Sequence, residues 1–297
     1  MMKKELKGII PPVVTIFDAE GKVDEKKYRN FIEFLCKHVQ GLFVCGTYGS
    51  GPLMTLEERK RTLEIALDQA NGRIPVVTHV GSTVPEHILE LAHHAEEKGA
   101  KAVASVAPFY FGYSQENIID FFKWFVKEVD IPVYLYNNPK TTGLEVKIET
   151  LKELHKNGLA GVKDSTFDLV YFYEVKNNIG LESFSYISGT EAFIIPAIPL
   201  GADAAICGLA NALPEIVVEL YNKAISKNYE EAYILQEKVN HLREIQHYAQ
   251  SIPAIHAMLK MRGIDSGHTK LPFKLVSDSK YSEMKGAFEK TDYVDFE

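Results

Sequence analysis

Lys163 is the residue of this sequence whose position best suits it for covalent chemistry. It closes an apolar, strand-like run that begins at Leu159, and polar residues follow it directly. A lysine at the end of a buried strand loses the solvation of its ammonium form, which lowers its pKa. The neutral amine can attack a carbonyl carbon and form a Schiff base. The alternative interpretation is a lysine that extends from the strand end into solvent.

Hydroxyl groups and glycines follow several other apolar runs in the same way. The residues concerned are Thr47, Tyr48, Tyr110, Tyr136, Ser188, Gly189, Ile206 and Gly208. Each has a structural explanation of its own, because glycine supplies unusual backbone angles and tyrosine favours strands. If the runs are strands of one parallel sheet, however, all of these residues and Lys163 gather at one edge.

The elements that must position these residues alternate between short apolar runs and longer amphipathic segments. Strands are predicted at 8–17, 42–45, 74–79, 102–106, 132–136, 159–163, 185–187 and 204–206. Helices are predicted at 24–39, 55–70, 85–98, 115–129, 146–156, 167–178, 192–198 and 214–226, with Thr55 as an N-cap. Eight such units predict an α/β protein, a (β/α)8 TIM barrel. The rival fold is an open doubly wound sheet, and the G-x-G-x-x-G fingerprint typical of it does not follow the first strand.

The pattern changes after residue 226. Helices are predicted at 229–248, 253–262 and 282–290, without a strand between them. We therefore expect a barrel catalytic domain at 1–226 and, at 227–297, a C-terminal helical extension packed on the barrel. No low-complexity linker separates the two parts.

Composition limits the possible partners. The chain has 297 residues, 25% of them charged, and a net charge of −7. Without a basic cluster, binding to nucleic acid or to an anionic membrane is not expected. No apolar run reaches the ~18 residues of a membrane span, and no signal peptide is visible. The cysteines, Cys36, Cys45 and Cys207, lack zinc or disulfide spacing, which favours a reducing, cytoplasmic location.

Three motifs together resemble a known family. They are G-T-Y-G-x-G-P from Gly46, Y-N-N-P-x-x-T-G from Tyr136 and G-V-K-D from Gly161. Their order and spacing are similar to those of the N-acetylneuraminate lyase and dihydrodipicolinate synthase superfamily, the class I pyruvate aldolases. The resemblance extends over nearly the whole chain and implies a lyase without a cofactor or metal.

The resemblance also implies residue roles. Lys163 stands at the Schiff-base position and Tyr136 at that of the proton-carrying tyrosine. Thr47 and Tyr48 stand where backbone N–H groups and a hydroxyl hold the pyruvate carboxylate, and Gly189 and Ile206 where backbone atoms line the pyruvate pocket. Tyr110 stands where a second tyrosine completes a hydroxyl relay, in many members from a neighbouring subunit. The expected catalytic residues are thus Lys163, Tyr136, Thr47 and Tyr110, and the expected substrate-binding residues are Thr47, Tyr48, Tyr136, Lys163, Asp164, Ser165, Gly189 and Ile206. The expected partners are a small 2-keto acid substrate and further copies of the chain, as a tetramer built from two dimers.

Departures from the family pattern favour one branch. Dihydrodipicolinate synthases usually carry an arginine where this chain has Thr141, although Lys140 is adjacent. Ser50-Gly51-Pro52 also replaces the usual glutamate after Gly49. The sequence is most similar to 2-keto-3-deoxygluconate aldolases, with Tyr48 in place of a commoner threonine. We therefore expect reversible cleavage of such sugar acids to pyruvate and glyceraldehyde.

The alternatives are 4-hydroxy-tetrahydrodipicolinate (dihydrodipicolinate) synthase, which condenses pyruvate with aspartate semialdehyde, and N-acetylneuraminate lyase. A preference for the non-phosphorylated sugar acid is expected, because the loop 109–117 contains no arginine or lysine for a phosphate. His79 ends a predicted strand and could contact a substrate hydroxyl. A metal role is not expected for His93 and His94 or for His241 and His247, whose spacing does not match a metal-binding helix.

Overall fold

The strands form a single parallel sheet that closes into a barrel. The computed structural model describes residues 6–291 and 293. Hydrogen-bonded neighbours follow the order β1-β8-β7-β6-β5-β4-β3-β2. The segment just after β1 closes the gap to β2. Its Val13 N–H donates to the Phe43 carbonyl oxygen at 2.9 Å, and the Phe43 N–H donates to the Pro11 carbonyl oxygen at 3.1 Å. The strands are β1 Gly8–Ile10, β2 Leu42–Val44, β3 Val76–His79, β4 Ala102–Val106, β5 Val133–Asn137, β6 Gly161–Asp164, β7 Ser185–Ser188 and β8 Ala204–Ile206.

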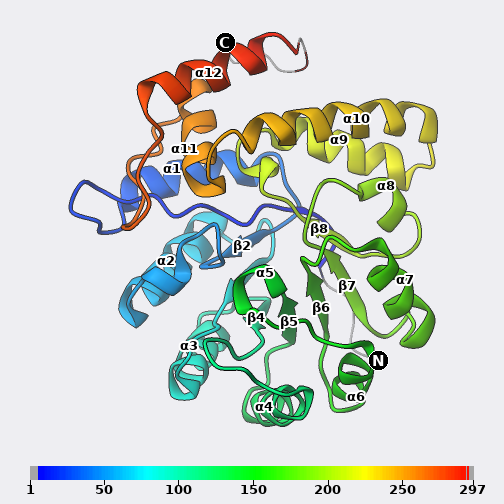
Figure 1. Cartoon of the computed structure of the whole chain (residues 1–297). Coiled ribbons are helices and arrows are strands. Elements are labelled where there is room, and N and C mark those ends of the chain that lie inside the picture. The colour runs from blue at the N-terminus through cyan, green and yellow to red at the C-terminus, as the bar shows by residue number, and fades with distance from the viewer. Residues whose placement is uncertain (1–5, 292, 294–297) are drawn as a thin grey trace.

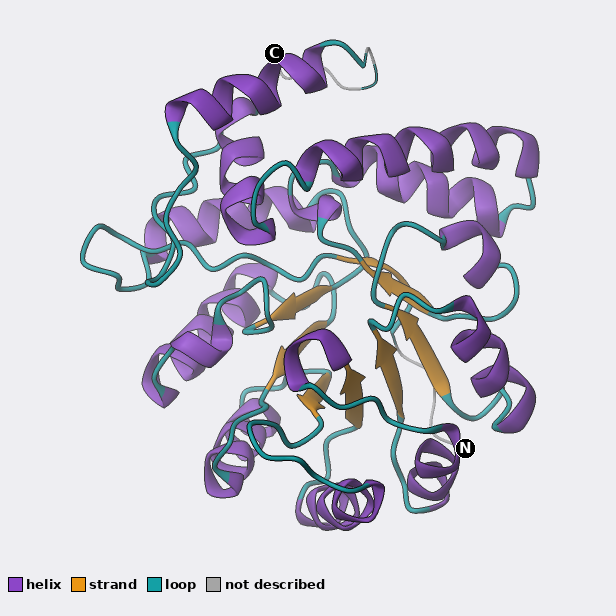
Figure 2. Ribbon diagram, in the orientation of Figure 1, coloured by secondary structure: helices purple, strands orange, loops and turns teal. Residues whose placement is uncertain are grey.

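Helices surround this barrel and bury the outer face of the sheet, while strand side chains that point inward bury its inner face (Figure 1). Figure 2 shows the strands at the centre and the helices as an outer ring. The predicted (β/α)8 TIM barrel with additional C-terminal helices is confirmed. The barrel helices are α1 Glu25–Cys36, α2 Leu56–Ala70, α3 Pro85–Glu97, α4 Gln115–Glu128, α5 Pro139–Thr142, α6 Ile148–Lys156, α7 Leu169–Asn178, α8 Ile194–Ala197 and α9 Pro214–Ile225.

The helical extension consists of α10 Tyr229–Gln246, α11 Ser251–Met261 and α12 Asp278–Glu289. α10 lies along α9, and α12 crosses the outer end of the extension (Figure 1). The division of the chain into two parts at residue 226 stays a prediction. The last residues of the predicted extension, 294–297, lie outside the described part. None of the helices in that part combines the length and the apolarity that a bilayer span requires.

Local chemistry explains where the elements begin and end. Thr55 caps α2 as predicted, in a reciprocal capping box with Glu58. The first strand ends at Ile10, well short of the predicted residue 17, because Pro11 and Pro12 have no N–H to donate to a strand ladder. The short helix α5 was not predicted. It starts with a proline at N1 and ends at Gly143, whose φ of 71° favours glycine.

Candidate active site

Alternate strand residues fill the inside of the barrel, and Lys163 is one of them. Tyr134 and Tyr136 of β5 and Phe43 of β2 belong to this inner layer. Lys163 of β6 lies in register with Tyr136 of β5, so their side chains enter the barrel side by side. Both residues stand at the carboxyl ends of their strands, where barrel enzymes hold their active sites.

The Lys163 amine is buried against aromatic rings. Its side chain is 4% exposed, and Nζ lies 3.6 Å from the Tyr136 ring centroid and 4.4 Å from that of Phe43. Burial lowers the pKa of Lys163, and the neighbouring Tyr136 hydroxyl opposes this only in part. The interpretation of Lys163 as a lysine that extends into solvent is therefore wrong. The geometry is that of an amine prepared to act as a nucleophile.

The Tyr136 hydroxyl is the centre of a hydrogen-bond network. Thr47, Lys163 and Ser165 are hydrogen-bonded to it, and Asn138 Nδ2 donates to it at 3.0 Å. Burial alone would raise the pKa of Tyr136, but the Lys163 charge and these hydrogen bonds outweigh it and hold the pKa below its usual value. A phenol in this setting can carry a proton to and from a substrate bound at Lys163.

The loop after β2 lines the same space with Thr47 and Tyr48. Cys45 and Ser50 have positive φ angles of 57° and 58°, which turn the chain sharply. Inside the loop the Ser50 N–H donates to the Thr47 carbonyl oxygen at 3.2 Å. The N–H groups of Thr47 and Tyr48 have no hydrogen-bond partner among the described residues. Two such donors beside a lysine can bind a carboxylate.

These residues line a pocket of about 470 Å³. Of the predicted site residues, the structure places seven in its wall: Thr47, Tyr48, Tyr136, Lys163, Ser165, Gly189 and Ile206. Gly189 is needed there, because a Cβ atom at this position would collide with the Ser165 hydroxyl.

The helical extension forms the outer wall of the pocket. This contribution was not predicted from the sequence. Arg243 of α10 and His247, directly after this helix, reach the pocket, together with the start of α11. Glu191 lies deeper, 3% exposed, and its Oε1 is 3.4 Å from Arg243 Nε. Burial raises the pKa of Glu191, and Arg243 opposes the shift. Glu191 could have been predicted as a site residue, because it follows a predicted strand. No neighbouring residue in the sequence indicates that Arg243 lines the pocket.

Asp164 is not among the residues that line the pocket, and its predicted substrate contact stays a prediction. It follows Lys163 directly on β6, and successive strand residues point to opposite faces, so Asp164 faces the helices. Its carboxylate accepts hydrogen bonds from the Tyr186 hydroxyl at 2.9 Å, the Thr166 hydroxyl at 2.8 Å and Asn137 Nδ2 at 3.1 Å. Burial raises its pKa to about 6 despite these bonds.

Two further predicted residues lie outside the pocket. His79 is 3% exposed, edge-on to the Tyr136 ring, and its Nε2 accepts a hydrogen bond from the Val106 N–H at 3.4 Å. It does not line the pocket, and its contact with a substrate hydroxyl stays a prediction. Tyr110 is 85% exposed and has a positive φ of 83°. Its phenol projects from the barrel rather than into the pocket of its own chain. In the described part of the chain, no three His, Cys, Asp or Glu residues are grouped so that they could hold a metal ion.

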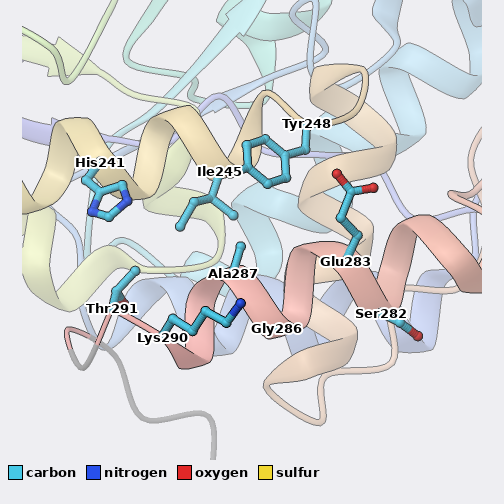
Figure 3. A pocket seen from close by; sticks show the side chains of 9 residues that line it. All are labelled: His241, Ile245, Tyr248, Ser282, Glu283, Gly286, Ala287, Lys290 and Thr291. Carbon is cyan, nitrogen blue, oxygen red and sulfur yellow. The ribbon is translucent and has the colours of Figure 1, made fainter.

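A second hollow, of about 600 Å³, lies between α10 and α12. Figure 3 shows His241 and Ile245 of α10, and Tyr248 just after this helix, on the side that faces α12. Most of its polar side chains are exposed, and the buried Thr291 hydroxyl is already bonded to the Phe288 carbonyl oxygen. This hollow therefore lacks the convergent buried groups of the pocket at Lys163.

A closed barrel whose rim holds a buried lysine beside a phenol is the arrangement of a class I, Schiff-base-forming lyase. The chain belongs to the dihydrodipicolinate synthetase family, whose model matches residues 5–291. The protein is thus an enzyme, a pyruvate-dependent carbon–carbon lyase, as the sequence predicts.

Individual relatives agree with this assignment. The chain is 28% identical over 279 residues to a 4-hydroxy-tetrahydrodipicolinate synthase of Methanosphaera stadtmanae, covering 92% of this chain and 94% of that one. It is similar to the structure of dihydrodipicolinate synthase from Aquifex aeolicus, with a TM-score of 0.91, 29% identity and 97% and 98% coverage. It is also similar to that of KD(P)GA from T. tenax, with a TM-score of 0.88, 26% identity and 97% and 99% coverage. A closer relationship to 2-keto-3-deoxygluconate aldolases is not confirmed.

Replacing Lys163 tests the chemistry of the site. Borohydride reduction in the presence of pyruvate should add one reduced pyruvate to the wild-type chain, at Lys163, because the imine forms on this amine. Lys163→Ala should show no such addition and should lose turnover by several orders of magnitude. Mass spectrometry of the digested chain locates the adduct. An adduct that persists in Lys163→Ala would refute the assignment.

Replacing Asp164 tests the buried carboxylate. Its folded-state pKa, about 6, lies above the ordinary 3.8, so its protonated form favours the folded state. As pH rises from about 4 to about 6, wild-type stability relative to Asp164→Asn should fall, by up to about 3 kcal/mol. Urea unfolding of both proteins across this range measures the difference. A difference that stays constant with pH would contradict the assigned environment.

Proposed function

We propose that the protein condenses pyruvate with an aldehyde that carries an anionic group, and that this aldehyde is aspartate semialdehyde. The observation that carries the proposal is a group of cationic side chains at the outer end of the pocket. Lys140 of α5 and Arg243 of α10 line it, with His247 one turn beyond Arg243. Burial lowers the pKa of His247, and the charges of Arg243 and Lys140 lower it further, which reflects how near the three groups lie.

This group of cations compensates for the missing arginine at position 141, which is the main argument against a synthase. Thr141 stands where an arginine is usual, and its hydroxyl donates to the Asn138 carbonyl oxygen at 3.1 Å. Lys140 and Arg243 supply positive charge to the same pocket from two other positions. Arg243 meets Glu191 through Nε, and its two terminal nitrogens have no partner among the described residues. A guanidinium with free terminal nitrogens can bind a carboxylate through two parallel hydrogen bonds.

The reaction follows from the inner part of the pocket. The Lys163 amine adds to the keto carbon of pyruvate, and loss of water gives an iminium. Loss of a proton from the pyruvate methyl group then gives an enamine, with Tyr136 as the proton carrier. The enamine carbon attacks the aldehyde carbon, and the new alkoxide takes a proton back from Tyr136. Water finally adds to the iminium, which releases the product and the free amine of Lys163.

The N–H groups of Thr47 and Tyr48 would hold the pyruvate carboxylate during these steps. This contact fixes the keto carbon against Lys163, which is chiefly a positioning effect. The same steps in reverse cleave a 4-hydroxy-2-keto acid.

A second candidate is cleavage of 2-keto-3-deoxy sugar acids, the reaction that the sequence motifs favour. Glu191 supports it, because a buried carboxylate in the pocket wall can accept hydrogen bonds from sugar hydroxyls. The similarity to the KD(P)GA of T. tenax agrees with it. The relatives named as synthases and the cations at the outer end favour condensation. The same cations remove the reason for expecting a non-phosphorylated substrate.

We also propose that the enzyme works as an oligomer in which Tyr110 enters the pocket of a neighbouring copy. Its phenol is held away from its own chain by a backbone angle that is costly for a tyrosine. Mixing inactive Lys163→Ala and Tyr110→Phe proteins should then restore part of the activity, because one mixed site regains both groups. Mixtures without any recovery, at concentrations where subunits exchange, would refute this arrangement.

Substrate comparison with outer-pocket variants tests the proposed function. The value of kcat/KM should be higher for pyruvate with aspartate semialdehyde than for cleavage of 2-keto-3-deoxygluconate, its 6-phosphate or N-acetylneuraminate. Arg243→Ala and Lys140→Ala should each lower kcat/KM for the semialdehyde about 10- to 100-fold, the cost of a charged hydrogen bond. Both should still form the pyruvate adduct.

Lys147→Ala, an exposed lysine outside the pocket, is the matched control. A tenfold preference for cleavage of a sugar acid over condensation would refute the synthase assignment in favour of the second candidate.

A further inference from the structure

Tyr48 joins the carboxylate-binding loop to the helical extension. Its hydroxyl accepts a hydrogen bond from Gln246 Nε2, the last residue of α10, at 3.2 Å. The side chain of Ser251, the first residue of α11, is hydrogen-bonded to the same hydroxyl. Gln246 is fully buried, so its amide cannot exchange this bond for one to water. One phenol therefore contacts the corner between two helices that lie about 200 positions further along the chain.

The Tyr48 ring also lies directly against the backbone after β8. A Cβ atom at Gly208 would be 2.5 Å from the Tyr48 hydroxyl oxygen and 2.7 Å from the ring carbon that bears it. The φ of Gly208 is −61°, which any residue can adopt, so the close approach of Tyr48 is what excludes a side chain here. The large side chain of Tyr48 thus occupies the space that a side chain at position 208 would need.

The phenol stays protonated in this position. Burial, and after it the nearby Glu191 carboxylate, raise the pKa of Tyr48 to about 12, although its bonds to Ser251 and Gln246 oppose the shift. A neutral hydroxyl can both accept from Gln246 and donate to a second partner. The side chain is thereby fixed at its far end, while Tyr48 itself lines the pocket.

We propose that Tyr48 is a positioning residue that holds the ketoacid-binding loop through its hydrogen bond to the helical extension. The proposal rests on the proposed function, since it concerns how pyruvate is bound. The N–H groups of Thr47 and Tyr48 bind a carboxylate well only if the loop is already in place, because ordering it on binding would cost affinity. In this chain α10 and α11 supply that order from outside the barrel.

Removing the hydroxyl alone tests the proposal. In Tyr48→Phe, the pyruvate concentration for half-maximal borohydride trapping should rise about 3- to 10-fold, the effect of one buried hydrogen bond. The KM for pyruvate should rise more than kcat falls. Combining Tyr48→Phe with Gln246→Leu should add little to the effect of Tyr48→Phe, since that change already breaks the bond to Gln246. Tyr233→Phe, an exposed tyrosine of α10, is the control and should match the wild type.

The pairing with Gly208 gives a second test, by rescue. Gly208→Ala should lower both the melting temperature and the extent of trapping, because the new methyl group meets the phenol. Adding Tyr48→Thr should restore part of both, since threonine does not reach Gly208. Adding Tyr48→Phe should not, because the ring carbon remains 2.7 Å from the added atom. Rescue by threonine and not by phenylalanine is specific to this contact.

The outcomes separate the two proposals. Normal trapping of pyruvate by the wild type, with an unchanged half-maximal concentration in Tyr48→Phe, would overturn the positioning role and leave the proposed function standing. Equal effects of Gly208→Ala in all three backgrounds would also overturn it. Absence of any pyruvate adduct in the wild type would overturn both proposals.

Discussion

The structure depends on the burial of one amine beside one phenol. Lys163 and Tyr136 lie in register on neighbouring strands, inside the barrel and away from water. Burial lowers the pKa of Lys163, while the shared hydrogen bonds and the lysine charge lower that of Tyr136. Lys163 thus makes the phenol fit to carry a proton, whereas burial, which Tyr136 opposes only in part, makes the amine fit to act as a nucleophile. Without the closed barrel, water would restore the ordinary chemistry of both.

The rest of the molecule keeps this pair in place and gives it a substrate. The hydrogen bond from Asn137 to Asp164, on the outer face of the same two strands, supports the register that aligns the pair. The loop after β2 and Arg243 of α10 both line the pocket that holds the amine. The helical extension thus contributes to the wall of this pocket together with the barrel.

Much of this could be predicted from the sequence because the signals are local. Apolar runs alternating with amphipathic segments predict the barrel, and Lys163, Tyr136 and Thr47 stand at run ends that a parallel sheet must bring together. A substrate contact of Asp164 stays a prediction, because side chains alternate along a strand and Asp164 does not line the pocket beside Lys163. Arg243 was not predicted as a site residue, because its place in the pocket depends on how α10 packs on the barrel. The residues around it in the sequence do not indicate this packing.

The most direct test of the account is the titration of Lys163 itself. The protein can be labelled with 13C at the lysine ε-carbons, and the Lys163 signal assigned by its absence from the spectrum of Lys163→Ala. The account predicts that this signal titrates clearly below the ordinary lysine value of about 10.4, and apart from the exposed lysines. A Lys163 signal that titrates with the exposed lysines, or above them, would contradict the central claim.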